Sequence, residues 1–177
     1  MAPDDPARDD AALSEEDKRA NLIRLVFGGD EAKCREFCDV IRAELPPDTA
    51  VILRGSAVTG RRWRDGAPFD SRGAGTSDLD LTLVGEEAIH LFKLTGFYVP
   101  GVHSRPVSEK APEIAPALIP LREKLMAMVG RPVNIQASRD VVIHFRGDLL
   151  GQPYLILIGK PDPATPLGLE DHTKANI

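Results

Sequence analysis

Two acidic residues with a single leucine between them, Asp78 and Asp80, stand at the start of an alternating apolar segment. In a β-strand, residues two apart point to the same side, with Cα atoms about 6.6 Å apart. Carboxylates held in this way repel each other, and a divalent cation relieves the repulsion. The pair predicts a Mg²⁺ or Mn²⁺ site of the kind that supports phosphoryl transfer. A solvated strand face is the alternative interpretation.

A glycine and a serine, Gly55-Ser56, follow a short apolar segment upstream of the aspartates. Glycine has no Cβ, so its backbone can approach a phosphate closely, and a helix that follows offers free N–H groups. The segment 54–72 holds five arginines and two acidic residues. Guanidinium groups suit the oxygens of a triphosphate. The pattern favours a phosphate site, and a turn followed by a solvated loop is the alternative.

Together these features resemble the DNA polymerase β-like nucleotidyltransferase superfamily. In that superfamily, a strand ending in Gly-Ser is followed by a short helix, a loop with glycine, and a strand that carries two aspartates. The matching segments are Leu53-Arg54-Gly55-Ser56, Thr59-Gly60-Arg61-Arg62 and Gly75-Thr76-Ser77-Asp78-Leu79-Asp80-Leu81. The resemblance covers residues 50–85 well and the rest of the chain loosely.

The resemblance implies that Asp78 and Asp80 are catalytic and hold Mg²⁺ or Mn²⁺. The residues implied to bind the nucleotide are Gly55, Ser56, Arg61, Arg62 and Ser77. The hydroxyl group of an acceptor would attack the α-phosphate of a nucleoside triphosphate and release pyrophosphate. The acceptor is expected to be a small molecule, an RNA or a protein. Compact relatives in bacterial toxin–antitoxin pairs add a helical protein as an expected partner.

A third carboxylate is usual in the superfamily, on a later strand, and the matching position here is Asn134. An amide can coordinate a cation, but it carries no charge and is not a general base. Asn134 is therefore assigned to the catalytic set, with Asp140 and Asp70 as other candidates for the missing acid. Because Asn134 is neutral, an inactive nucleotide-binding or regulatory module is a second hypothesis. An interaction protein with an idle site is a third hypothesis.

The distance from Ser56 to Asp78 is longer than is usual in the superfamily, so the segment 63–74 is interpreted as an insertion. Trp63 and Phe69 within it either stack on a base or anchor the loop as an apolar plug. Three further basic residues have two readings each, a ligand contact or an ordinary surface position: His103, Arg122 and Lys124.

Apolar periodicity predicts the elements that position these residues. Helices are expected at 14–27, 30–45, 86–93, 117–129 and 138–150, with a strand over 141–143 as the alternative to the last. Strands are expected at 50–53, 79–84, 132–136 and 153–159, and irregular structure at 60–77 and 95–110. Interleaved helices and strands predict an α/β (α+β) fold, a small mixed sheet flanked by helices. The nucleotidyltransferase-like domain spans 14–160, between a disordered acidic tail at 1–13 and a flexible tail at 161–177.

The net charge of −5 is concentrated in the first 17 residues, which hold seven acidic side chains and one basic one. The remaining chain is nearly neutral, which argues against a strongly basic nucleic-acid-binding protein. No apolar segment approaches the ~20 residues that span a bilayer, and the N-terminus lacks the apolar core of a secretory signal. Cys34 and Cys38 lie four apart on a predicted helix, typical of buried thiols rather than of a metal or redox site. We therefore expect a cytoplasmic protein that does not contact the membrane.

Overall fold

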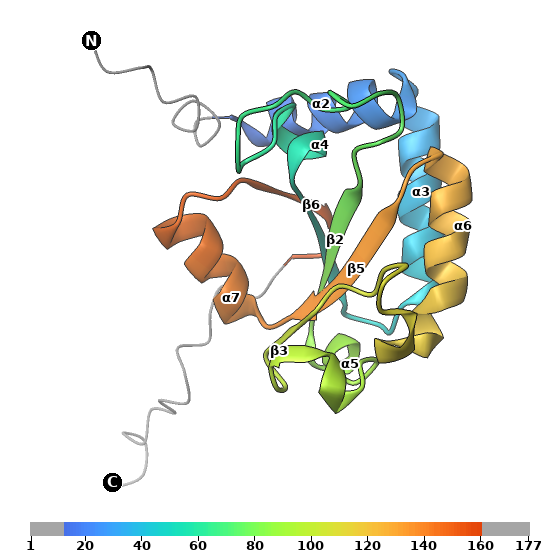
Figure 1. Ribbon diagram of the computed structural model, residues 1–177, viewed down its shortest axis with the longest axis vertical. Coiled ribbons are helices and arrows are strands. Elements are labelled where there is room, and N and C mark those ends of the chain that lie inside the picture. The colour runs from blue at the N-terminus through green and yellow to red at the C-terminus, as the bar shows by residue number, and fades with distance from the viewer. Residues whose placement is uncertain (1–12, 161–177) are drawn as a thin grey trace, which may run out of the picture.

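The structure, a computed structural model, describes residues 13–160 (Figure 1), so the predicted tails at 1–13 and 161–177 lie outside the described residues except for Leu13. The helices are α2 (Glu15–Phe27), α3 (Glu31–Glu44), α4 (Ser56–Thr59), α5 (Glu86–Ile89), α6 (Ile119–Val129) and α7 (Asp140–His144). Shorter turns are η1 (Leu94–Gly96), η2 (Pro112–Ile114), η3 (Pro116–Leu118) and the π-helical η4 (Phe145–Leu149). The strands are β1 (Ala50–Arg54), β2 (Leu79–Val84), β3 (Phe97–Val99), β4 (His103–Ser104), β5 (Val133–Ser138) and β6 (Tyr154–Ile158).

The strands form one six-stranded sheet in the order β3-β4-β5-β2-β1-β6. β2 and β5 run parallel, and the other neighbours run antiparallel. Helices interleave with the strands along the chain and pack on the sheet (Figure 1). The predicted class, a small mixed sheet flanked by helices, is confirmed.

The first two helices begin and end where local backbone chemistry requires it. Ser14 and Asp17 form a capping box, in which the Asp17 N–H donates to Ser14 Oγ at 3.1 Å and the Ser14 N–H donates to Asp17 Oδ2 at 3.3 Å. Gly28 ends α2 in a left-handed conformation with φ 63°. Asp30 then caps α3 by accepting from the Ala32 N–H at 3.0 Å. These caps account for the close match between the predicted and observed bounds.

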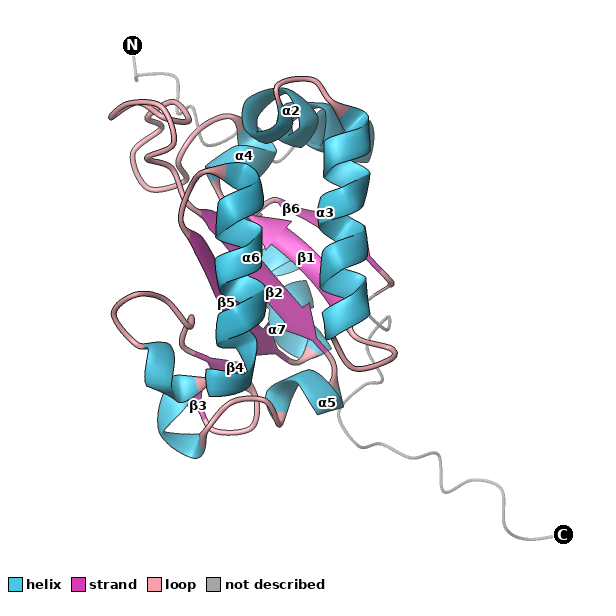
Figure 2. Ribbon diagram, turned by 90° about the vertical axis from the view of Figure 1, so that its right-hand side faces the viewer, coloured by secondary structure: helices cyan, strands magenta, loops and turns pink. Residues whose placement is uncertain are grey.

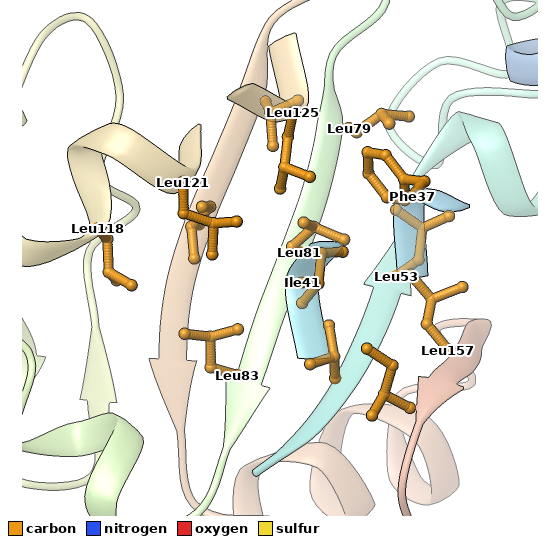
Figure 3. Packing of buried hydrophobic residues seen from close by; sticks show 14 of the residues in the cluster. Phe37, Ile41, Leu53, Leu79, Leu81, Leu83, Leu118, Leu121, Leu125 and Leu157 are labelled. Carbon is orange, nitrogen blue, oxygen red and sulfur yellow. The ribbon is translucent and has the colours of Figure 1, made fainter. Parts of the chain in front are cut away.

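One face of the sheet carries the main apolar core. Helices α3 and α6 lie side by side over this face (Figure 2), and α2 packs against α3, α4 and β6. The alternate residues of β2 point toward the helices, as a strand with a period of two requires. Figure 3 shows this layer, with Leu79, Leu81 and Leu83 of β2, Leu53 of β1, Phe37 and Ile41 of α3, and Leu121 and Leu125 of α6. Burial of each such side chain contributes about 1.5–3 kcal/mol, so the core holds the sheet rigid beneath its other face.

The opposite face of the sheet is covered only in part, by α7 (Figure 1). Ile143 of α7 is 1% exposed and packs in a second, smaller cluster with Ala50, Ile52 and Val84. The remainder of this face carries polar side chains from the carboxyl end of β1 and the amino ends of β2 and β5. The uncovered polar half of the sheet is the floor of the candidate site.

The segment 95–110, expected to be irregular, contains the short antiparallel strands β3 and β4. They are joined by a turn in which Gly101 has φ 69° and the Val102 N–H donates to the Val99 carbonyl at 3.0 Å. Pro-Gly between apolar residues is a turn signal, and here it was the sequence cue to a hairpin. The prediction was therefore wrong for these residues.

Three predicted helices differ from the structure in extent. The helix expected at 86–93 stops at Ile89, and the one expected at 117–129 begins at Ile119, after the 3₁₀ turn η3. Residues 140–149 are helical, first as α7 and then as the π-helical turn η4, so the strand alternative at 141–143 was wrong. Within the described range, no helix combines the length and apolar character needed to cross a bilayer.

The two cysteines are part of the core, as predicted. Cys34 and Cys38 are free thiols, 3% and 8% exposed, and both belong to the main apolar cluster. Among residues 13–160, no group of three or more His, Cys, Asp or Glu side chains is placed to hold a metal ion. The cysteines therefore act as small apolar side chains of α3.

Candidate functional site

Three polar residues form a row across the uncovered face of the sheet. Arg54 on β1 pairs with Asp80 on β2, and Asp80 pairs with Asn134 on β5. Because these residues share one register, their side chains emerge on the same face. Arg54 and Asp80 line a cavity of about 870 Å³, which is also lined by residues of the loop 60–77 and of β4. The strand register therefore gathers residues that are 80 positions apart in the sequence.

The two aspartates and the asparagine are joined by hydrogen bonds. Asn134 Nδ2 donates to Asp78 Oδ2 at 2.7 Å and to Asp80 Oδ1 at 3.1 Å. Burial, followed by the charge of Asp78, raises the pKa of Asp80 to about 6, and the hydrogen bond from Asn134 opposes that rise. The structure thus brings together all three residues of the predicted catalytic set. The amide bridges the carboxylates and offsets part of their repulsion.

This donor set fits a hard divalent cation. Mg²⁺ is commonly held by one or two carboxylates, with water and substrate phosphate oxygens completing its octahedron. Asp78 and Asp80 supply the carboxylates, and rotation of the Asn134 amide would offer an additional oxygen. A cation held in this way would keep positions open for phosphate oxygens, as phosphoryl-transfer sites require.

The position of Gly55 disfavours a side chain. Its φ is 86°, and a Cβ placed on it would lie 3.3 Å from Asp80 Oδ2. The backbone therefore passes directly beside the carboxylate before the single turn of α4 begins at Ser56. Ser56 is 8% exposed and lines the cavity with Gly55. Both predicted residues lie next to the aspartates.

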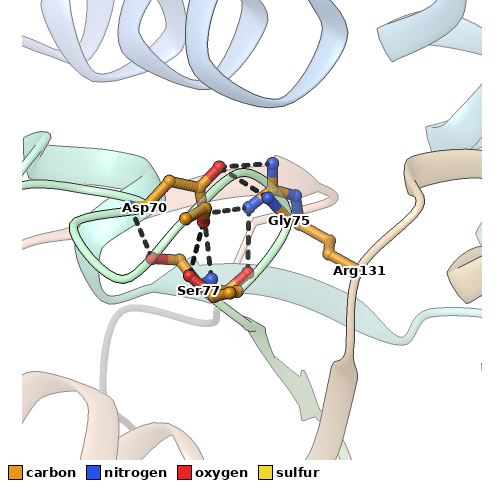
Figure 4. A network of polar contacts seen from close by, with 6 residues as sticks. Asp70, Gly75, Ser77 and Arg131 are labelled. Atoms are coloured by element: carbon orange, nitrogen blue, oxygen red, sulfur yellow. Dashed lines mark hydrogen bonds and ion pairs between the residues drawn. The ribbon is translucent and has the colours of Figure 1, made fainter.

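The loop 60–77 is held to the body by a network centred on Asp70 (Figure 4). The Asp70 carboxylate accepts from Arg131 Nη1 at 2.9 Å and Nη2 at 3.1 Å, and from the Ser77 and Gly75 N–H groups at 2.9 and 3.0 Å. Arg131 Nη1 also donates to the Ser77 carbonyl at 2.9 Å. This network places Ser77, and with it Asp78, at the mouth of the cavity.

The predicted phosphate contacts from the loop also lie at the cavity. Arg61, Arg62 and Ser77 are among its lining residues. Arg62 forms an ion pair with Asp65 at 3.0 Å, and Ser77 Oγ accepts from the Asp70 N–H at 2.8 Å. Because a hydroxyl retains its own proton after accepting a hydrogen bond, Ser77 remains able to donate to a ligand.

The two aromatic residues of the insertion have different surroundings. Phe69 packs against the core, and the Arg131 guanidinium lies 4.5 Å from its ring centre. It is the apolar plug, one of the two alternatives considered. Trp63 is 42% exposed and lines the cavity, where it can stack on a ligand ring.

Several secondary candidates take structural roles instead. Asp70 is engaged by Arg131, so it does not supply the missing third carboxylate. Asp140 begins α7 and is not among the residues that line the cavity. Arg122 is 6% exposed and donates from Nε to the Val133 carbonyl at 2.7 Å, so neither of its predicted roles holds. Lys124 lies on an exposed face and pairs with Glu44 at 2.7 Å.

The sequence did not predict the residues on one side of the cavity, and it gave two interpretations for His103 on the other side. Arg146 and Gln152 line the side next to β1, and nothing in their local sequence marks them. His103 and Tyr98 line the side next to β5, with ring centroids 5.9 Å apart. His103 Nδ1 lies 3.0 Å from Ser138 Oγ, and burial lowers the pKa of the imidazole. His103 lines the cavity, and its contact with a ligand stays a prediction.

Comparison with protein-family models, with curated proteins and with solved structures gives no match to this chain. Its function is therefore argued from the cavity itself. The cavity combines a carboxylate pair, a glycine turn and several arginines around one opening.

Replacing Asn134 with aspartate is expected to raise the affinity for Mg²⁺ about tenfold, because each added carboxylate strengthens a hard-cation site. In EDTA the same variant is expected to melt below wild type, since three carboxylates would then share one site. Mg²⁺ titration and thermal unfolding of Asn134→Asp measure the two effects. Wild-type Mg²⁺ affinity in the variant would contradict the placement of residue 134 at the cation.

Proposed function

We propose that this protein is a Mg²⁺-dependent nucleotidyltransferase, which moves a nucleoside monophosphate from a nucleoside triphosphate to a hydroxyl group. The observation that carries the proposal is the pair Asp78 and Asp80, which lines an arginine-rich cavity and is bridged by hydrogen bonds from Asn134. Mn²⁺ has the same ligand preferences and is the alternative cation.

In the proposed reaction, an acceptor oxygen forms a bond to the α-phosphorus while the bond to the β-phosphate oxygen breaks. Pyrophosphate and a proton are released. The cation, when bound, neutralises charge that develops on the phosphate oxygens. Gly55 and Ser56 lie beside Asp80 and would hold the triphosphate against it, with Arg61 and Arg62 above.

The second candidate is a nucleotide-binding or regulatory module that does not turn over. One observation favours it: residue 134 is an amide that donates to both carboxylates and cannot act as a base. Such a module binds a nucleotide and a cation but releases no pyrophosphate. Pyrophosphate release therefore separates it from the enzyme.

The acceptor and the protein partners belong to the proposal as well. The opening of the cavity is compatible with a small molecule, an RNA end or a protein side chain as the acceptor. A helical protein partner and a cytoplasmic location, where nucleoside triphosphates and Mg²⁺ are abundant, complete the proposed setting.

The experiment that tests the proposed function is thermal unfolding with ATP, GTP, CTP and UTP, each with and without Mg²⁺ or Mn²⁺. A bound ligand raises the melting temperature by mass action. We expect one nucleotide to give a metal-dependent rise that the Asp78→Ala/Asp80→Ala variant lacks, together with pyrophosphate release by wild type. An equal rise in both proteins, or none in either, would overturn the proposed site. An interaction protein with an idle site predicts that none of the nucleotides has an effect.

A further inference from the structure

Two arginines converge at the side of the cavity next to β1. Arg54, the last residue of β1, is 7% exposed and lines the cavity floor. Arg146, from η4, lines the same side. Arg146 Nε donates to Gln152 Oε1 at 2.8 Å, and Arg54 Nη1 lies 3.5 Å from the same oxygen. Two guanidinium groups thus share one neutral acceptor.

The positive charge of this pair is only partly balanced by the protein, through the carboxylate of Asp80. Within residues 13–160, neither Arg54 nor Arg146 forms an ion pair with a carboxylate. Arg54 Nε and Nη2 are buried and have no hydrogen-bond partner in this part of the chain. Burial, followed by the charge of Arg146, lowers the pKa of Arg54 to about 10, and the opposing influences of Tyr154 and Asp80 only partly offset this. Buried donors without partners are costly, and such groups in proteins usually meet a ligand or water.

The position of the pair shows which part of a ligand it faces. Arg54 directly precedes Gly55, and its row partner Asp80 is one of the two carboxylates that would hold the cation. The guanidinium groups therefore lie on the Gly55 side of the carboxylates, opposite Tyr98 and His103. An anion bound there would sit within the field of both arginines.

We propose that Arg54 and Arg146 together bind one phosphate group of the ligand that fills the cavity. Two guanidinium groups match the two negative charges of a terminal phosphate, and each offers a planar fork of N–H donors to its oxygens. Arg54 Nε and Nη2 are the two donors of such a fork that lack partners. The phosphate is either the terminal phosphate of the donor nucleotide or a phosphate carried by the acceptor. That assignment rests on the proposed function, whereas the phosphate site itself does not.

The direct test measures binding of inorganic phosphate and of tripolyphosphate in EDTA, by calorimetry and by thermal unfolding. We expect tripolyphosphate affinity to fall at least tenfold in Arg54→Met and in Arg146→Gln. The matched control is Arg24→Met, because Arg24 is an exposed arginine of α2 and does not line the cavity. Arg24→Met is expected to keep wild-type affinity. Equal affinity in wild type, Arg54→Met and Arg146→Gln, or no binding to wild type, would overturn the proposal.

A merely structural role for Arg54 predicts a different result. Without ligand, we expect Arg54→Met to melt at or above the wild-type temperature, because the variant removes buried donors that lack partners. A structural arginine would instead give a less stable variant with unchanged phosphate affinity. Arg54→Lys keeps the charge but loses the fork, and we expect its affinity to fall between those of wild type and Arg54→Met.

Two further measurements identify the source of the phosphate. With Mg²⁺, a site for the donor predicts that Arg54→Met weakens ATP binding at least tenfold and leaves AMP binding unchanged. A site for the acceptor predicts unchanged ATP and AMP binding, with loss of inorganic phosphate binding alone. Failure of the proposed function would appear separately, as absence of pyrophosphate release from a wild-type protein that still binds phosphate through Arg54.

Discussion

Asp80→Asn is expected to raise the melting temperature of the metal-free protein and to abolish its metal-dependent activity. Asp80 is partly buried beside the exposed Asp78, and burial followed by the charge of Asp78 raises the pKa of Asp80 to about 6. A neutral amide of the same shape removes the repulsion, which corresponds to a gain on the order of 2 kcal/mol near pH 7. A cation site whose carboxylates repel each other in the metal-free protein should behave in this way.

The pH dependence of this effect has a definite sign. Between an unfolded pKa of about 3.9 and the folded value of about 6, the native protein binds more protons at Asp80 than the unfolded chain does. Stability in EDTA therefore falls as the pH rises through this window, and the loss is complete above it. Asp80→Asn should lack this fall. Unfolding in urea at a series of pH values measures the difference between the two proteins.

Asp78→Asn provides the matched control for Asp80→Asn. Asp78 is exposed, so its neutralisation should relieve the same repulsion while the desolvation of Asp80 remains. We expect a smaller gain in stability and a similar loss of activity, about a thousandfold or more, because each carboxylate is proposed to hold the cation. A lower melting temperature for Asp80→Asn in EDTA would contradict the proposed repulsion.

The second large effect is expected at the network that holds the loop 60–77. Asp70→Asn removes the ionic partner of Arg131, whose side chain is 7% exposed, and leaves its charge uncompensated. Breaking a pair of this kind typically costs about 3–5 kcal/mol, and the lower end applies here because Asp70 is 20% exposed. Denaturant unfolding of the variant measures the loss.

Acid should weaken the stabilisation from this network, whereas acid should remove the destabilisation caused by Asp80. Burial raises the pKa of Asp70, but the hydrogen bonds from Arg131 and from the Ser77 and Gly75 N–H groups outweigh it and hold the pKa well below the ordinary aspartate value. The stabilisation is therefore complete above an unfolded pKa of about 3.9 and is lost as the pH falls below it. The Asp70→Asn variant should lose less stability than wild type between neutral and acid pH.

A control for Asp70→Asn lies in the same loop. Asp65 forms an exposed ion pair with Arg62, and pairs of that kind contribute about 0–1 kcal/mol. Asp65→Asn should therefore be close to wild type in stability. If Asp70→Asn were equally mild, the network would not anchor the loop. Because Ser77 precedes Asp78, we also expect Asp70→Asn to weaken nucleotide binding more than Asp65→Asn does.

Local patterns in the sequence were enough to predict most of the framework. Alternation at 79–84 placed the leucines of β2 in the core and Asp80 on the other face, because a strand has a period of two. Capping residues and glycines set the bounds of α2 and α3. The hairpin of β3 and β4 was missed because its strands are too short to show a periodicity; β3 pairs with β4, and β4 pairs with β5.

Some features of the candidate site were likewise predictable from the sequence, and others were not. By itself, the sequence determined that Asp78 and Asp80 share a side and that Gly55 ends a strand. Only the tertiary structure decided that the two aspartates meet Asn134, that Asp70 serves Arg131 rather than a cation, and that Arg54 and Arg146 converge. The reason is physical: spacing along one element follows from backbone geometry, whereas contacts between elements depend on strand register and on which groups find partners when water is excluded.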